Sequence, residues 1–372
     1  MRYSTATIGS AFVFCSVRTC RGFVVPSTAA LSTGASSATL RWDGSAGASR
    51  KQRIGRGGPI MALKGLARKA KEAQVAKDME ELRASEPDSP IFKILEKAES
   101  GAEAGDGPEY PLSSVLRKNK GTLSVVAEYR RILKSGFIDG ILEPELLCPL
   151  FRNGGGSCVA VATEPQTGGC TDADLAKIVT EQENSRGDFP GPMPVILRDL
   201  VISEFEIARA KAAGAAGVTV VLALVGAERA GELAGFCKKL GMEAVIQTTC
   251  QEEIEQAAAS EDISIISVVG KDVDGAKELV PHIPDGVLSV VHVDRRSDEC
   301  LDEIEDCWQL RDAGYNTVWA SELLYKGGMM QDETAEAIIR AIRAKGSVKY
   351  GSARGMSGKG EGAKEYLGYL AQ

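Results

Sequence analysis

Eight short runs of apolar and β-branched residues recur along the chain, and a helical pattern follows each of them. The runs cover 123–128, 157–163, 194–198, 217–224, 244–248, 263–269, 287–293 and 316–320. Strands that are apolar on both faces and alternate with helices are typical of a parallel sheet covered by helices. Eight such units over about 220 residues match the requirement of a closed barrel. We therefore predict an α/β fold, a (β/α)8 TIM barrel.

The helical patterns that follow the strands complete the eight units, and two more patterns precede the first strand. The first set covers 143–152, 172–184, 204–213, 227–240, 251–260, 276–282, 298–313 and 332–344. The two earlier patterns, 61–85 and 91–98, predict an N-terminal helical extension. The alternative is an open doubly wound sheet. Its Gly-rich first turn opens a helix, whereas Gly154-Gly155-Gly156 precedes a strand, so the pattern favours a closed barrel.

Composition divides the chain into four parts. We predict a presequence at 1–60, a helical extension with an acidic linker at 61–107, the barrel at 108–345 and a Gly-rich tail at 346–372. The N-terminal helix and the tail are candidate docking segments for a partner protein. A tail without a partner is the alternative reading.

The charge of the chain changes sign along its length. Residues 1–71 hold twelve basic residues and one acid, Asp43, which leaves 32 basic and 50 acidic residues for 72–372. An acidic body lacks the clustered basic surface that phosphate backbones require, so we expect no nucleic-acid partner. We expect no membrane span either, because no apolar run reaches the roughly 18 residues that such a helix needs.

The first 60 residues are predicted to address the protein to an organelle. The apolar stretch 11–17 is too short to span a bilayer and is typical of a signal segment. The following stretch, 27–56, is rich in Ser, Thr, Ala, Gly and Arg, as plastid transit peptides are. A signal followed by a transit segment resembles the bipartite presequences of algae with complex plastids. We therefore predict a plastid (chloroplast) location, with a tail of no address value as the alternative.

Nine cysteines and two histidines are scattered without a Cys-x-x-Cys pair. A zinc site or a redox motif needs ligands at close spacing, so the sequence predicts neither a metal nor another cofactor.

In a barrel of this kind the chemistry lies at the carboxyl-terminal ends of the strands. The polar residues at these ends are Glu128, Arg130, Thr163, Glu164, Arg198, Asp199, Gln247, Lys271, Asp272, His292, Asp294, Ser321 and Glu322. Two arginines, a lysine and a histidine on one rim of an acidic domain predict an anionic small-molecule ligand, such as a phosphate or a carboxylate. Solvated rim charges without a ligand are the alternative.

Several motifs in this order resemble indole-3-glycerol-phosphate synthase over roughly 91–344. Ala127-Glu128-Tyr129-Arg130-Arg131, with Ser135-Gly136 after it, is similar to the first-strand motif of that family. The segments 154–164 and 194–202 are similar to its second and third motifs. Family members are (β/α)8 lyases of tryptophan biosynthesis. They close the indole ring of a carboxyphenylamino-deoxyribulose 5-phosphate with loss of carbon dioxide and water.

The resemblance assigns roles to individual positions. It implies a catalytic set and a phosphate-binding set for a phosphorylated substrate. The catalytic set is Glu128, Arg130, Arg198, Gln247 and His292, and the phosphate-binding set is Ser135, Gly136, Lys271, Ala320 and Ser321.

Several of these positions depart from the family pattern. Arg130 and Arg198 stand where the family has lysines, and Gln247 stands where it has a glutamate. Arginine keeps its proton near neutral pH and glutamine cannot act as a base. Ala320 replaces a glycine, while Glu128 is unchanged.

Three hypotheses remain open from the sequence. One is a lyase with rebuilt chemistry, in which the two arginines clamp the substrate, Glu128 and Asp294 act as bases and His292 carries protons. The second is a non-catalytic relative that binds an anionic metabolite or a partner protein. The third is a barrel with a different sugar-phosphate reaction.

Overall fold

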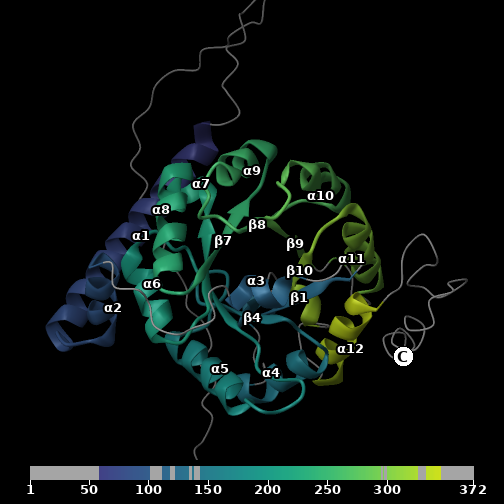
Figure 1. Ribbon diagram of the computed structural model, residues 1–372, viewed down its shortest axis with the longest axis horizontal. Helices are drawn as coiled ribbons and strands as arrows, with labels where there is room; N and C mark the ends of the chain where they lie inside the picture. The colour runs from purple at the N-terminus through teal and green to yellow at the C-terminus, as the bar shows by residue number, and fades with distance from the viewer. Residues whose placement is uncertain are drawn as a thin grey trace, which may run out of the picture. The chain divides into compact units, whose positions relative to one another are not determined.

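The computed structural model describes residues 58–100, 111–117, 122–133, 136–137, 143–294, 296, 300–325 and 332–344. Nearly all of the predicted presequence, the Gly-rich tail and Ser135 lie outside these residues. Eight parallel strands close into a barrel in the order β1-β10-β9-β8-β7-β6-β5-β4 (Figure 1). This closure confirms the predicted (β/α)8 TIM barrel.

The barrel strands follow the predicted apolar runs closely. They are β1 (Ser124–Tyr129), β4 (Cys158–Ala162), β5 (Val195–Arg198), β6 (Gly217–Val221), β7 (Glu243–Thr248), β8 (Ile265–Val268), β9 (Leu288–Val293) and β10 (Thr317–Ala320). The closing strand is β1, where Val126 lies opposite Trp319 of β10 on one side and Cys158 of β4 on the other. An open doubly wound sheet has no such closing pair, so that alternative is wrong.

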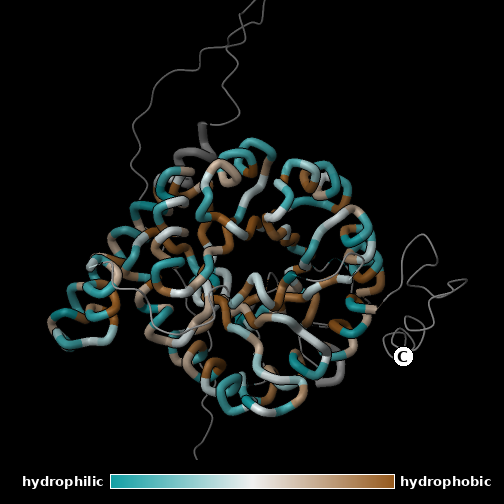
Figure 2. Tube along the Cα trace, in the orientation of Figure 1, coloured by the Kyte–Doolittle hydropathy of each residue, from teal (hydrophilic) through white to brown (hydrophobic). Residues whose placement is uncertain are grey.

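Helices surround the strands, as Figure 1 shows. They are α4 (Pro144–Asn153), α5 (Asp172–Asn184), α6 (Glu204–Ala212), α8 (Ala227–Lys239), α9 (Gln251–Ala258), α10 (Val273–Leu279), α11 (Leu301–Ala313) and α12 (Asp332–Arg343). Figure 2 shows hydrophobic residues concentrated on the strands and hydrophilic ones on the outer faces of the helices. The predicted strand 217–224 leaves the sheet after Val221 and continues as the short helix α7 (Leu222–Val225), and the predicted helix 276–282 begins earlier, at Val273, and ends in a 3-10 turn at Val280–His282.

Alternate residues of each strand face the interior of the barrel, because successive strand side chains point to opposite faces. Val125 and Ala127 belong to the apolar layer between strands and helices, whereas Val126, Ile196 and Trp319 belong to the cluster inside the barrel. Val245, Ile265 and Val290 are further members of that interior cluster. Because strand side chains repeat every two residues, the residue two positions after each of these interior residues other than Trp319 also points inward, at the carboxyl-terminal end of its strand. These residues are Glu128, Arg198, Gln247, Ser267 and His292.

A short helix that the sequence pattern did not predict, α3 (Pro111–Leu116), closes the amino-terminal end of the barrel. Leu112 and Leu116 are part of the interior cluster. The Glu243 carboxylate accepts hydrogen bonds from the backbone N–H groups of Leu112 at 2.7 Å and Ser113 at 2.8 Å. A Cβ at Gly217 would lie 2.4 Å from the Leu112 side chain, so only glycine leaves room for this helix.

The N-terminal extension consists of α1 (Gly58–Ser85) and α2 (Pro90–Glu99), so the first helix begins three residues before the predicted position 61. Lys71 of α1 is 14% exposed, and its Nζ lies 2.9 Å from Asp199 Oδ2 and 3.1 Å from Glu206 Oε1. Burial opposes the charge of Lys71, but the carboxylates of Glu206 and Asp199 outweigh it and raise the pKa of the ammonium group. Since Asp199 follows Arg198, this ion pair links α1 to the rim of the barrel.

No helix in the described part of the chain combines the length and the apolar character needed to cross a membrane.

Candidate active site

A cleft of about 420 Å³ opens at the carboxyl-terminal ends of the strands. Its lining comes from strands on several sides of the barrel and from the loops that follow them. The lining residues are Arg130, Ile132, Leu133, Gln166, Thr167, Arg198, Val269, Gly270, His292, Asp294, Ser321 and Glu322. The predicted site residues Arg130, Arg198, His292 and Ser321 thus meet in one cleft.

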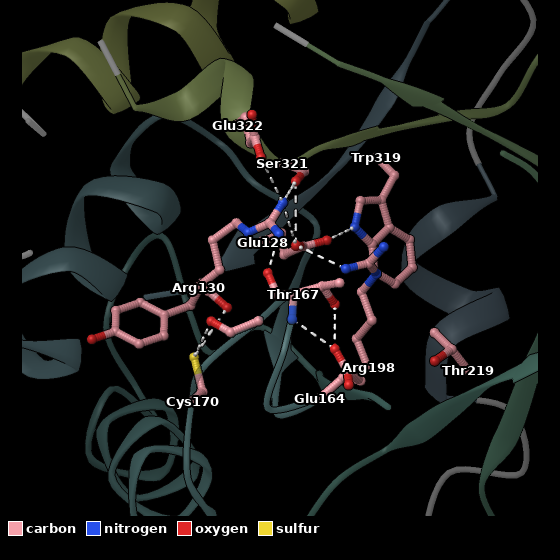
Figure 3. Close-up of polar contacts among 12 residues, drawn as sticks. Glu128, Arg130, Glu164, Thr167, Cys170, Arg198, Thr219, Trp319, Ser321 and Glu322 are labelled. Atoms are coloured by element: carbon pink, nitrogen blue, oxygen red, sulfur yellow. Dashed lines mark hydrogen bonds and ion pairs between the residues drawn. The ribbon is translucent and has the colours of Figure 1, made fainter. Parts of the chain in front are cut away.

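A fully buried carboxylate, Glu128, holds the wall beside this cleft together (Figure 3). Its Oε2 accepts a hydrogen bond of 2.6 Å from the indole Nε1 of Trp319. Its Oε1 accepts hydrogen bonds of 3.2 Å from Ser321 Oγ and from an Nη of Arg198, and it lies 3.6 Å from an Nη of Arg130. Both oxygens are therefore engaged by protein donors, and two guanidinium groups balance the buried charge.

Arg130 is held by further groups of the wall. One Nη donates to Ser321 Oγ at 2.8 Å and lies 3.4 Å from Glu322 Oε1, and the other donates to the carbonyl of Thr167. Tyr325 accepts a hydrogen bond of 3.0 Å from the backbone N–H of Arg130 and donates one of 3.0 Å to the carbonyl of Glu128. This guanidinium is built into the wall to a greater extent than that of Arg198.

Besides Thr163 Oγ1, five buried polar atoms at the carboxyl-terminal end of the barrel have no hydrogen-bond partner among the residues that the structure describes. They are Nε of Arg130, Nε of Arg198, Nε2 of Gln247, Oγ of Ser267 and Nε2 of His292. A buried donor or acceptor without a partner costs about 1–3 kcal/mol, so native proteins rarely leave one, and a group of five is exceptional. Such a group indicates a site that a polar ligand or water satisfies.

His292 takes part in this site as a neutral ring. Its imidazole stacks on the indole of Trp319, with ring centroids 4.8 Å apart and an interplanar angle of 17°. Burial, and then the charge of Arg198, hold the pKa of His292 well below its usual range. The predicted positive charge at this position is therefore absent at neutral pH.

Lys271 does not join the two arginines. Its side chain is exposed and lines a separate pocket of about 90 Å³ together with Arg296 and Asp306. The lining of the main cleft includes two guanidinium groups and the carboxylates of Glu322 and Asp294. Of the four groups predicted on this rim, the two arginines line the main cleft beside these carboxylates, His292 lines it as a neutral ring and Lys271 lines the neighbouring pocket.

Comparison with known proteins identifies the family. The model of the family "Indole-3-glycerol phosphate synthase" matches residues 70–275. The chain belongs to the indole-3-glycerol phosphate synthase family. The synthase of Micrococcus luteus is 27% identical over 280 residues, which cover 73% of this chain and 94% of that protein. The synthase of Carboxydothermus hydrogenoformans is 24% identical over 261 residues, which cover 66% of this chain and 91% of that protein.

The region that matches the synthase family contains Glu128, Arg130, Arg198 and Gln247. Gln247 faces inward beside Ser267, its register partner on β8. His292 and Ser321 lie after the matched region and still reach the same cleft.

The phosphate-binding positions expected of a synthase are spread over the mouth of the barrel. Gly136 belongs to the short strand β3 (Gly136–Phe137), which pairs with β2 (Ile132–Leu133). Ala320 is buried in the outer apolar layer, and the Ser321 hydroxyl is bonded to both Arg130 and Glu128. These contacts do not test phosphate binding, so the phosphate-binding roles stay predictions.

Sequence reasoning missed Trp319, which contacts both Glu128 and His292. The alternation of side chains along a strand could have identified Trp319 as a residue that points into the barrel. Trp319 pairs in register with His292, so the two side chains point to the same side of the barrel wall.

Proposed function

We propose that this member of the synthase family binds a phosphorylated or otherwise anionic small molecule in the cleft and does not close an indole ring. The observation that carries the proposal is the set Arg130, Arg198 and Gln247, which stand at the positions where the resemblance expects two lysines and a glutamate. The two arginines keep hydrogen-bond donors but do not release a proton near neutral pH, and glutamine cannot accept a proton as a carboxylate base does.

Ring closure requires an acid that protonates a ketone and a base that takes up a proton. Arginine stays protonated throughout the neutral pH range, so neither Arg130 nor Arg198 supplies that acid. Glu128 is unchanged, but both of its oxygens are occupied by protein donors. The loss of a single acid or base costs about 10²- to 10⁴-fold in rate, and here several groups differ together.

Binding, in contrast, is well supported. Arg198 lines the cleft, and within the described part of the chain its Nε has no hydrogen-bond partner. Guanidinium groups bind carboxylates and phosphates through paired, charge-assisted hydrogen bonds. The cleft of about 420 Å³ lies within the range of small-molecule sites, roughly 300–1,000 Å³.

One observation favours a second candidate, a synthase of tryptophan biosynthesis with rebuilt chemistry. The unpartnered Nε2 of His292 belongs to a neutral imidazole at the cleft, and a neutral imidazole can accept a proton from a substrate. In that hypothesis the arginines are electrostatic clamps and His292 carries the proton.

The experiment measures ring closure of carboxyphenylamino-deoxyribulose 5-phosphate by the full chain. The same assay is run on the triple variant Arg130→Lys, Arg198→Lys, Gln247→Glu. We expect no turnover above background for the native chain and measurable turnover for the triple variant. Turnover by the native chain at a rate typical of enzymes would establish the second candidate instead.

Binding is measured separately by titration calorimetry and thermal unfolding, with D-ribulose 5-phosphate and inorganic phosphate as probes. We expect D-ribulose 5-phosphate to bind and to raise the midpoint of unfolding. If neither probe binds to the folded native chain, the proposed binding function is wrong whatever the lyase assay shows.

We also propose that the protein works in a plastid, on the basis of the signal-like and transit-like segments within residues 1–60. A fusion of these residues to a fluorescent protein, expressed in an alga with a complex plastid, is expected to enter that organelle. A cytosolic signal from the fusion would contradict the proposal.

A further inference from the structure

We propose that a second site, on the outer side of the barrel wall, binds a small organic cation that carries a primary ammonium group. The site is a pocket of about 350 Å³, lined by α1, by α6 and by the segments that follow β4 and β5. The linings of this pocket and of the main cleft have no residue in common. The inference therefore does not depend on the function proposed for the cleft.

A buried hydroxyl in the lining of this pocket carries the first step. Thr163 is 8% exposed, and its Oγ1 has no hydrogen-bond partner among the described residues. Val159 and Val161 of β4 belong to the apolar layer outside the barrel, so the two-residue period directs Thr163 outward as well. Because a buried polar atom without a partner is costly in free energy, the hydroxyl indicates a ligand or a water at this place.

The charge of the pocket carries the second step. Its lining holds two cations and twice as many carboxylates, namely Lys71, Arg209, Asp78, Glu164, Asp172 and Asp199. Both cations are already paired: Lys71 lies 2.9 Å from Asp199, and Arg209 lies 3.5 Å from Asp78 and 3.8 Å from Asp199. The pocket thus keeps an excess of negative charge, which favours a cationic ligand.

The spacing of the carboxylates carries the third step. Within the described residues, no three His, Cys, Asp or Glu side chains are grouped closely enough to hold a metal ion. The Glu164 carboxylate is fixed by the N–H of Thr167 at 2.6 Å and by its hydroxyl at 2.7 Å (Figure 3), whereas Asp172 is exposed at the start of α5. Separated acceptors of this kind suit an extended organic cation better than a compact metal ion.

The donor pattern of the ligand follows from these acceptors. An ammonium group has three donors and no acceptor, so it can bond the Thr163 hydroxyl and a carboxylate at the same time. A volume of about 350 Å³ lies within the range of small-molecule sites, roughly 300–1,000 Å³. A short aliphatic amine meets both requirements.

The test uses 1,4-diaminobutane as the probe and 1,4-butanediol as a neutral compound of the same chain length. Calorimetry and thermal unfolding are carried out on the full chain at neutral pH. We expect the diamine to bind and to raise the midpoint of unfolding, and the diol to do neither. Failure of the diamine to bind, or equal affinities for the two compounds, would overturn the inference.

Thr163→Val removes the hydroxyl and keeps the shape of the side chain. We expect it to weaken binding of the diamine by about tenfold, as for a lost hydrogen bond to a charged group. Thr317→Val is the matched control, because Thr317 is 0% exposed and has an unpartnered Oγ1 but belongs to β10 and does not line the pocket. Equal affinities in these two variants would contradict the role given to Thr163.

A pair of exposed carboxylates locates the diamine and serves also if Thr163→Val does not fold. Asp172→Asn removes a carboxylate from this pocket, and Asp294→Asn removes one from the main cleft. We expect a loss of affinity of about threefold in the first variant and none in the second. The inference is wrong if Asp172→Asn loses no more affinity than Asp294→Asn, since the diamine would then bind in the cleft or to the acidic surface in general.

Discussion

Arg198 lies 3.2 Å from Glu128, and this ion pair crosses the interior of the barrel from β5 to β1. The same carboxylate oxygen lies 3.6 Å from Arg130. Two cations that the sequence places 68 positions apart are therefore joined through one anion, since Arg130 and Arg198 meet at Glu128. Three charged groups in a buried wall depend on one another for their stability.

Glu128→Gln is expected to lower the free energy of unfolding by about 3–5 kcal/mol, because it removes a fully buried anion that the buried Arg130 and the partly buried Arg198 share. Urea unfolding measures the change. Glu81→Gln is the control, since Glu81 is 67% exposed and pairs with Lys77 at 3.5 Å, where a loss of no more than about 1 kcal/mol is expected. Equal losses in the two variants would show that the Glu128 network contributes nothing beyond a surface pair.

Arg198→Gln and Arg130→Gln are expected to separate binding from stability. Arg130 is fixed by Ser321, Glu322 and Thr167, so its replacement should mainly lower the midpoint of thermal unfolding. Arg198 faces the cleft with an unpartnered Nε, and its replacement should weaken binding of D-ribulose 5-phosphate by about tenfold or more, as expected for a lost charge-assisted hydrogen bond. Calorimetry on both folded variants compares their affinities for D-ribulose 5-phosphate. A larger loss of affinity in Arg130→Gln than in Arg198→Gln would contradict the assignment of Arg198 to binding and Arg130 to stability.

His292 is expected to make the barrel less stable in mild acid. The unfolded chain takes up a proton at this residue below its ordinary pKa of 6.5, and the folded barrel resists that proton because the ring is buried near Arg198. The free energy of unfolding therefore falls as the pH decreases through 6.5, by up to about 1.4 kcal/mol per pH unit.

Comparison of urea unfolding at pH 7.5 and 5.5 should show a smaller pH effect in His292→Gln than in the native chain. The chain has one other histidine, His282, which is 35% exposed, and His282→Gln is the control. If the His282 variant loses the same share of the pH effect, the burial of His292 is not its source.

Lys71→Met is expected to destabilise the N-terminal extension and the rim together. The substitution removes the cation that Asp199 and Glu206 share and leaves Asp199 with Arg209 alone, at 3.8 Å, at a cost of about 3–5 kcal/mol. Lys77→Met on the same helix, 68% exposed, should be nearly neutral. Limited proteolysis and urea unfolding provide the measurement. A Lys71 variant as resistant as the Lys77 variant would contradict the role given to this ion pair.

The fold was predictable because its signal is repeated and local. Val, Ile and Ala dominate the buried strands, and eight repeats of one strand and one helix leave few architectures to consider. The helix α3 escaped prediction because its six residues are too few for a helical period to show. The run 217–224 was read as one strand because Leu222 to Val225 are as apolar in a helical turn as they are in a strand.

The site was predictable only in part. The strand-end rule brought Arg130, Arg198, His292 and Ser321 to one cleft. It did not reveal that Glu128 and Glu322 neutralise the arginines, because pairing depends on side-chain direction across the barrel and not on position along the chain. Trp319 was missed because an apolar residue within a strand is read as core, and its hydrogen bond to Glu128 appears only when β10 and β1 are neighbours.

The ion pair between Lys71 and Asp199 sets a limit on how far the chain can be shortened from its amino-terminal side. Proteolytic trimming that stops ahead of α1 keeps the ammonium group that neutralises the residue next to Arg198. Trimming that passes Lys71 removes this group, so that Glu206 loses its cation and Asp199 keeps only Arg209, at 3.8 Å. Cleavage that removed the proposed targeting segment would therefore have to stop before Lys71 for this ion pair to form beside Arg198.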